Sequence, residues 1–96
     1  MSEFWDDNII QIIPSPHISA VFTDDIGRLE WIPSAGTALY RTEAGRTGLQ
    51  LFIFDIDGVP SDPTNDVNFV GWYSGNNRPT DDQLEVAIER VRRKTA

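Results

Sequence analysis

A chain of 96 residues with 40% apolar content is long and apolar enough to build one core without disulfides or metals. Fifteen acidic and eight basic residues give a formal net charge of −7, so we expect no binding to nucleic acid or to anionic membranes. The absence of cysteine excludes disulfides, thiolate metal ligands and cysteine nucleophiles. The N-terminus is acidic and no apolar run is long enough to cross a bilayer, so residues 1–96 are predicted to form a single cytoplasmic, soluble domain.

The first half of the chain predicts a β-hairpin between two less regular strands. Residues 9–13 fit a strand ended by prolines, but together with Trp5 they also fit a helical face, and both alternatives stay open. Residues 17–23 and 28–32 alternate in polarity around a turn at residues 24–27, which predicts a hairpin. Residues 37–42 are predicted to form the next strand.

The second half contains the most apolar strand and the clearest helix. Residues 49–56 carry large side chains on both faces, which indicates a central strand. After an acidic loop at residues 57–66, a further strand is predicted over residues 67–73. Thr80 and Gln83 have capping-box spacing. They precede an apolar stripe formed by Leu84, Ala87, Ile88 and Val91.

A helix over residues 81–93 is also favoured by its charges. Asp81 and Asp82 fall in its first turn and Arg92, Arg93 and Lys94 in its last, as the helix dipole prefers. Consecutive strands followed by one helix predict an α+β fold. We expect a mainly antiparallel sheet of about five strands, with residues 49–56 central and the C-terminal helix packed on one face.

The segment 51–59 resembles the first motif of the haloacid dehalogenase-like phosphatases, in which an apolar strand ends in Asp-x-Asp-Gly. The resemblance implies that Asp55 attacks phosphorus, that Asp57 acts as general acid/base, and that magnesium bridges the site. It covers nine residues, and the 38 residues after Gly58 leave room for only one strand and one helix. The parallel sheet of that family needs several more crossovers. Hence we expect no catalysis, and magnesium-dependent phosphoryl transfer through Asp55-Ile56-Asp57-Gly58 is the alternative function.

Other candidate chemistry is sparse, so no cofactor or metal is predicted. The acidic loop at residues 55–66 offers oxygen ligands for calcium or magnesium, but their spacing does not match an EF-hand. His17 is the only histidine, and no glycine-flanked serine accompanies it. We interpret the loop as turn-forming and His17 as a surface residue.

Aromatic residues suggest how the protein acts. The strand at residues 67–73 has aromatic side chains on both faces, so it must either bury both faces or present one to a partner. Trp72 and Tyr73 end this strand beside an open loop and are the predicted interaction residues. The sequence therefore predicts a small acidic, non-catalytic interaction protein of inhibitor, immunity, anti-defence or adaptor type. Its expected partner is another protein or a second copy in a homodimer.

Overall fold

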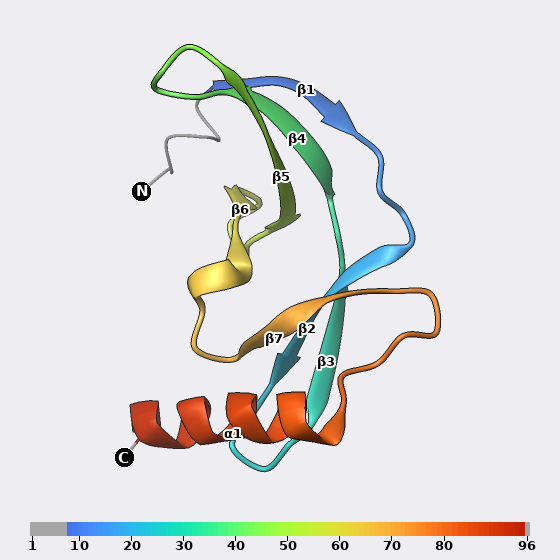
Figure 1. Ribbon diagram of the computed structural model, residues 1–96, viewed down its shortest axis with the longest axis vertical. Coiled ribbons are helices and arrows are strands. Elements are labelled where there is room, and N and C mark those ends of the chain that lie inside the picture. The colour runs from blue at the N-terminus through green and yellow to red at the C-terminus, as the bar shows by residue number, and fades with distance from the viewer. Residues whose placement is uncertain (1–7, 96) are drawn as a thin grey trace. The chain divides into compact units, whose positions relative to one another are not determined.

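The computed structural model describes residues 8–95 and contains antiparallel strands and a C-terminal helix (Figure 1). Every strand pairing in this range is antiparallel, which confirms the predicted α+β class. Residues 9–13 form a strand, and Trp5 lies outside the described residues. The elements are β1 (Ile9–Ile13), β2 (Ile18–Thr23), β3 (Leu29–Pro33), β4 (Gly36–Arg41), β5 (Thr47–Phe54), β6 (Pro60–Ser61), the 3₁₀ helix η2 (Pro63–Asn65), β7 (Phe69–Ser74) and α1 (Asp81–Thr95).

The strands form two sheets rather than the one sheet of about five strands that we expected. One sheet has the order β1-β4-β5-β6 and the other β3-β2-β7. The chain correspondingly divides into a first unit (residues 1–16 and 34–62) and a second unit (residues 17–33 and 63–96). The chain crosses from one unit to the other three times, and each crossing has a proline at the boundary: Pro16, Pro33 and Pro63. Because proline has no N–H to donate, a strand ladder cannot continue regularly through it.

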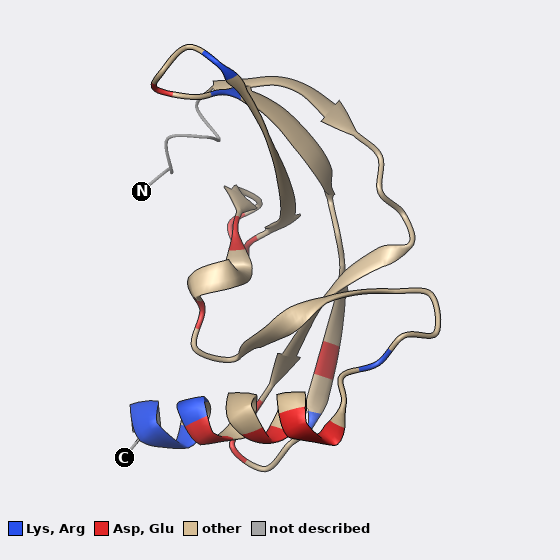
Figure 2. Ribbon diagram, in the orientation of Figure 1, with Lys and Arg blue, Asp and Glu red and all other residues tan. Residues whose placement is uncertain are grey.

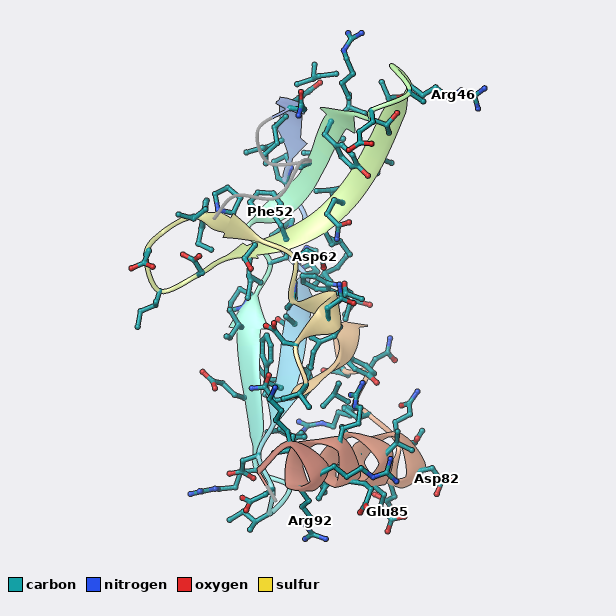
Figure 3. All side chains as sticks on the ribbon, turned by 90° about the vertical axis from the view of Figure 1, so that its left-hand side faces the viewer. Arg46, Phe52, Asp62, Asp82, Glu85 and Arg92 are labelled. Atoms are coloured by element: carbon teal, nitrogen blue, oxygen red, sulfur yellow. The ribbon has the colours of Figure 1, made fainter. Side chains whose placement is uncertain are left out.

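The core of the first unit is built on β4 and β5. Ala38 and Phe52 are fully buried, and Ile9, Ala35 and Tyr40 pack against them; Figure 3 labels Phe52 on β5. Strand β5 lies between β4 and β6, which confirms the prediction of a central strand, but its side chains are not buried evenly. Phe52 and Ile53 are buried, whereas Leu49 is 63% and Phe54 55% exposed. Strand β6 pairs only with Ile53 and Phe54, which leaves the start of β5 without a strand on that side among the described residues.

Gly36 allows β1 to approach the start of β4. Its φ of +143° lies in a region that side chains rarely adopt. A Cβ atom placed there would be 2.8 Å from Cγ2 of Ile12 and 3.0 Å from the carbonyl oxygen of Ile13. Glycine is therefore required at this position both by its backbone angle and by the closeness of β1.

The second unit is centred on β2, which pairs with β3 on one side and with β7 on the other. The consecutive residues Ala20, Val21, Phe22 and Thr23 are all buried. Since successive side chains point to opposite faces, both faces of this half of β2 are covered. A bulge in β7 shifts the register between Val21 and Phe22. Regular alternation over residues 67–73 would place Phe69 on the side of Tyr73, opposite Trp72. Tyr73 and Trp72 do lie on opposite sides, but the expectation for Phe69 is wrong, because the bulge brings it to the side of Trp72, where the two rings pack edge-on with centroids 5.7 Å apart.

Helix α1 follows the predicted capping and charge pattern. The Gln83 N–H donates to Oγ1 of Thr80 at 3.2 Å, and the Thr80 N–H donates to Oε1 of Gln83 at 2.9 Å, which completes the capping box. Figure 2 shows acidic residues at the start of the helix and basic residues at its end.

The apolar stripe of α1 packs against β2 and β7. Ala87 and Val91 are buried, whereas Leu84 and Ile88 are only half-buried. Asp82 and Glu85, labelled in Figure 3, are exposed. No helix in residues 8–95 combines the length and apolarity needed to cross a membrane.

Candidate functional site

The same type of five-residue turn occurs in three hairpins, at residues 24–28, 42–46 and 55–59. In each, the first residue (Asp24, Thr42 or Asp55) accepts through its side-chain oxygen from the N–H of the fifth residue, at 2.9–3.1 Å. The fourth residue is always glycine with φ between +77° and +86°. Its N–H donates to the carbonyl oxygen of the first residue. This combination describes a hairpin turn whose glycine occupies the left-handed region.

The phosphatase-like segment is the third of these turns. Oδ1 of Asp55 accepts from the N–H groups of Asp57 and Val59, both at 2.9 Å. The backbone N–H of Asp55 donates to the Val59 carbonyl and the N–H of Gly58 donates to the Asp55 carbonyl, both at 2.9 Å. Asp55 and Gly58 thus have the same backbone roles as Asp24 and Gly27, which have no catalytic resemblance. The turn geometry therefore accounts for Asp55 and Gly58, whereas the position of Asp57 is held by Ile26 and Ala44 in the other two turns.

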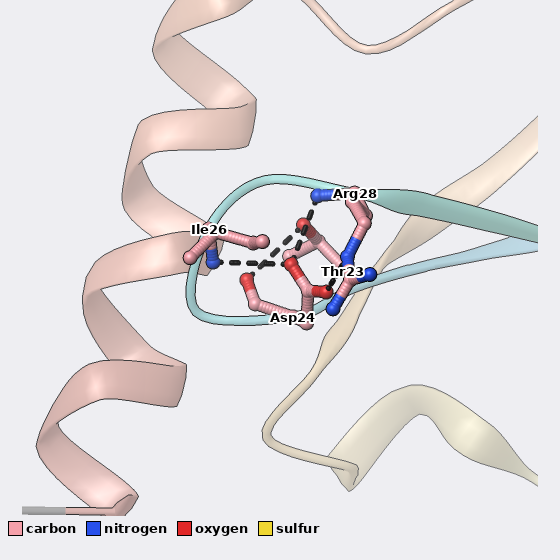
Figure 4. Close-up of polar contacts among 4 residues, drawn as sticks. All are labelled: Thr23, Asp24, Ile26 and Arg28. Atoms are coloured by element: carbon pink, nitrogen blue, oxygen red, sulfur yellow. Dashed lines mark hydrogen bonds and ion pairs between the residues drawn. The ribbon is translucent and has the colours of Figure 1, made fainter.

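Asp24 shows the strongest electrostatic effect in these turns (Figure 4). Its carboxylate accepts from the N–H groups of Ile26 and Arg28, and it also accepts from Nε of Arg28 at 2.7 Å. The backbone hydrogen bond from Arg28 is the main cause that lowers the pKa of Asp24 from 3.8, and the Arg28 guanidinium adds to it. The ionised carboxylate is therefore the form that holds the β2–β3 turn.

Replacing this carboxylate gives a pH-dependent prediction. The folded-state pKa of Asp24 is lowered, so its contribution to stability is present above 3.8 and is lost as the pH falls through the folded-state value. We expect Asp24→Asn to lower the urea midpoint at neutral pH and to match the original protein well below pH 3.8. Urea titrations over this range measure the effect. Asp25→Asn, the same charge change one residue along, should lower the midpoint less at neutral pH; an equal loss would contradict the assignment.

The acidic loop does not gather its side chains into a metal centre. Within residues 8–95, no three His, Cys, Asp or Glu side chains are placed to hold one metal ion. His17 is exposed, and its carbonyl oxygen accepts from the N–H of Gly75 at 3.3 Å.

The structure places Trp72 and Tyr73 on opposite faces of the β3-β2-β7 sheet, as expected for neighbours in a strand. Both side chains are half-buried. Trp72 packs on Phe69, which is buried and in turn contacts Phe22. The predicted pair therefore does not form one contact surface.

Tyr73 instead belongs to an aromatic patch that we define as Trp31, Tyr73 and Arg78. The Trp31 and Tyr73 rings meet edge to face with centroids 6.4 Å apart, and the Arg78 guanidinium lies 5.7 Å from the Trp31 ring centre. Trp31 is 37% exposed and Arg78 is exposed. The Tyr73 hydroxyl donates to Oε1 of Gln83 at 3.1 Å, which links the patch to the helix cap.

Sequence reasoning missed Trp31 and Arg78 as members of this patch. Trp31 pairs with Val21 across β2–β3, and Tyr73 pairs with Ser19 across β2–β7. Both registers are needed to see that the two rings share a face. The one sequence signal for Trp31 was the alternation of residues 28–32, which assigns its side chain to one face of the hairpin but does not show that Tyr73 lies on the same face.

Comparisons with known proteins give no information on the function of the patch. No protein-family model matches the chain, and neither does any curated protein or solved structure.

Proposed function

We propose that the chain is a small acidic, non-catalytic interaction protein that binds a protein partner through the patch of Trp31, Tyr73 and Arg78. The observation that carries the proposal is an exposed arginine that lies over the ring of a partly exposed tryptophan, which in turn contacts a tyrosine. Tryptophan, tyrosine and arginine are the residue types that contribute most to binding energy at protein interfaces. Inhibitors, immunity proteins, anti-defence proteins and adaptors work through such contacts.

The geometry of the patch supports a preformed binding surface. Trp31 is held by Tyr73, and Tyr73 is held by the hydrogen bond to Gln83 in the capping box. Side chains fixed before binding lose less conformational entropy when a partner arrives. Trp72 is the weaker candidate because its ring already packs on the buried Phe69.

The charge of the chain favours a basic partner surface. Residues 1–89 contain fifteen acids and four arginines, a formal charge of −11. Such a field accelerates encounter with a positive surface and opposes nucleic acid. We accordingly propose a basic protein surface as the target. The cytoplasmic location, favoured by the absence of cysteine, belongs to the same proposal.

The test is capture of partners from a lysate of the native host by the tagged protein. We expect Trp31→Ala and Arg78→Ala each to weaken a specific, salt-sensitive capture, with Trp31→Ala weakening it about thirtyfold or more, as for a central interface residue. Val86→Ala removes an apolar side chain that is 63% exposed on α1 and should leave capture unchanged. Circular dichroism of each variant confirms that the fold is kept.

Two results would contradict the proposal. One is a captured protein whose binding is unaffected by Trp31→Ala and Arg78→Ala. The other is binding that is lost equally with Val86→Ala, because the contact would then lie elsewhere on the second unit.

A further inference from the structure

Among residues 8–95, strand β1 is an edge of the sheet in the first unit. In the order β1-β4-β5-β6 it pairs with β4 on one side only. An edge strand presents a row of backbone N–H and C=O groups that can pair with another strand. On the opposite side of the sheet, β6 consists of Pro60 and Ser61 and pairs only with Ile53 and Phe54, so among the described residues the start of β5 is also without a strand partner on that side.

The edge formed by β1 is apolar, exposed and uncharged. Ile10 is 53%, Ile12 46% and Ile13 42% exposed. No Asp, Glu, Lys or Arg occurs from position 8 to position 23, and Figure 2 shows β1 without these residues along its length. Charged residues normally protect an exposed edge from pairing, and β1 has none. A chain with a net charge of −7 thus has a neutral strand at an edge where two copies can approach.

The sequence of β1 is self-complementary. It reads Ile-Ile-Gln-Ile-Ile in both directions, with Gln11 at its centre. If two copies pair antiparallel about a two-fold axis at Gln11, the axis places Gln11 against Gln11, Ile10 against Ile12 and Ile9 against Ile13. Every cross-strand pair is then apolar with apolar or amide with amide, and such pairs stabilise antiparallel sheets.

We propose that the chain forms a homodimer by antiparallel pairing of β1 with β1 of a second copy, centred on Gln11. The two-fold pairing uses the same edge of both copies, so the assembly closes at two chains. The proposal is independent of the aromatic patch, which lies in the second unit.

A bulge limits the strength of this contact. The pairing of β1 with β4 shifts between Ile9 and Gln11, so only Gln11, Ile12 and Ile13 continue in a regular register. Bulges are common at sheet edges, where they increase the local twist and shorten the pairing surface. We therefore expect a reversible dimer of modest affinity rather than an obligate one.

The first test is the concentration dependence of the molecular mass by sedimentation, between about 10 µM and 1 mM. We expect a monomer–dimer equilibrium for the unmodified protein. Gln11→Lys and Gln11→Glu place like charges against each other at the axis, and each should weaken the dimer about tenfold or more. Leu49→Lys adds the same charge at an exposed position of β5 and is the matched control, which should dimerise as the unmodified protein does.

Mixing the two charged variants tests the register itself. Because the axis brings residue 11 against residue 11, equal amounts of Gln11→Lys and Gln11→Glu should form a heterodimer more readily than either forms a homodimer. A protein that stays monomeric throughout this range overturns the proposal. A dimer that is insensitive to both variants, or variants that do not rescue each other, overturns it as well. A β1 edge that instead pairs with a strand of a different protein would appear as a monomer in these measurements.

Discussion

Phe52→Ala is expected to lower the free energy of unfolding by about 3–5 kcal/mol, which is the cost of deleting a large side chain from a packed core. Phe52 is fully buried and forms the centre of the first unit together with Ala38. Leu49→Ala removes a side chain of the same strand that is 63% exposed and should cost only about 0.5 kcal/mol. Urea unfolding measures both variants; similar losses would contradict the assignment of the core.

The same variant tests the prediction of a single domain. Trp31 and Trp72 belong to the second unit, whereas Phe52 belongs to the first. In a Trp5→Phe background, fluorescence reports only on these two tryptophans of the second unit. If the units unfold together, Phe52→Ala should shift this fluorescence transition. A transition that does not move would mean that the units unfold separately and that the single-domain prediction is wrong.

Gly36→Ala is expected to lower the free energy of unfolding by about 2–4 kcal/mol, because strain and overpacking act together. At φ +143° any side chain is strained, and the added Cβ would press on Ile12 and on the backbone oxygen of Ile13. The backbone oxygen cannot move away without displacing β1. Thermal unfolding measures the loss.

Gly45→Ala separates these two causes. Gly45 also has a positive φ, +81°, but a Cβ there would meet no atom within 4 Å. Only backbone strain of about 1 kcal/mol is then expected. If both glycine variants lost the same stability, the contact between Gly36 and β1 would contribute nothing.

Local signals predicted most of the elements, and long-range pairing explains what was missed. The hairpin around Asp24 and the helix cap at Thr80 depend on residues close in sequence, and both were predicted correctly. The division into two sheets depends on β1 pairing with β4 and β2 pairing with β7, which join distant segments. No local pattern specifies such partners. The short pairing of β6 at Pro60 was also missed, since two residues give no alternation to read.

The candidate site was likewise predicted only where local sequence was sufficient. Tyr73 was predicted from its position at a strand end, but its neighbours Trp31 and Arg78 come from other elements. Trp72 was chosen together with Tyr73 because both end the strand beside an open loop, and that position alone does not show that the Trp72 ring packs on the buried Phe69. The Asp55 segment resembled a catalytic motif because turns and phosphatase loops both need aspartate and glycine at close spacing.

The presence of the same type of turn in three hairpins has a consequence for the order of folding. Each turn joins strands that are neighbours in sequence, so the hairpins β2–β3, β4–β5 and β5–β6 close loops of only a few residues and should form within about 1–10 µs. The β2–β7 ladder pairs residues such as Ala20 and Trp72, and the β1–β4 ladder pairs Ile12 with Ala38. Closing these longer loops costs more chain entropy before any contact forms. We therefore expect preformed hairpins to assemble first, with the ladders of β1 and β7 added late and setting the overall folding rate.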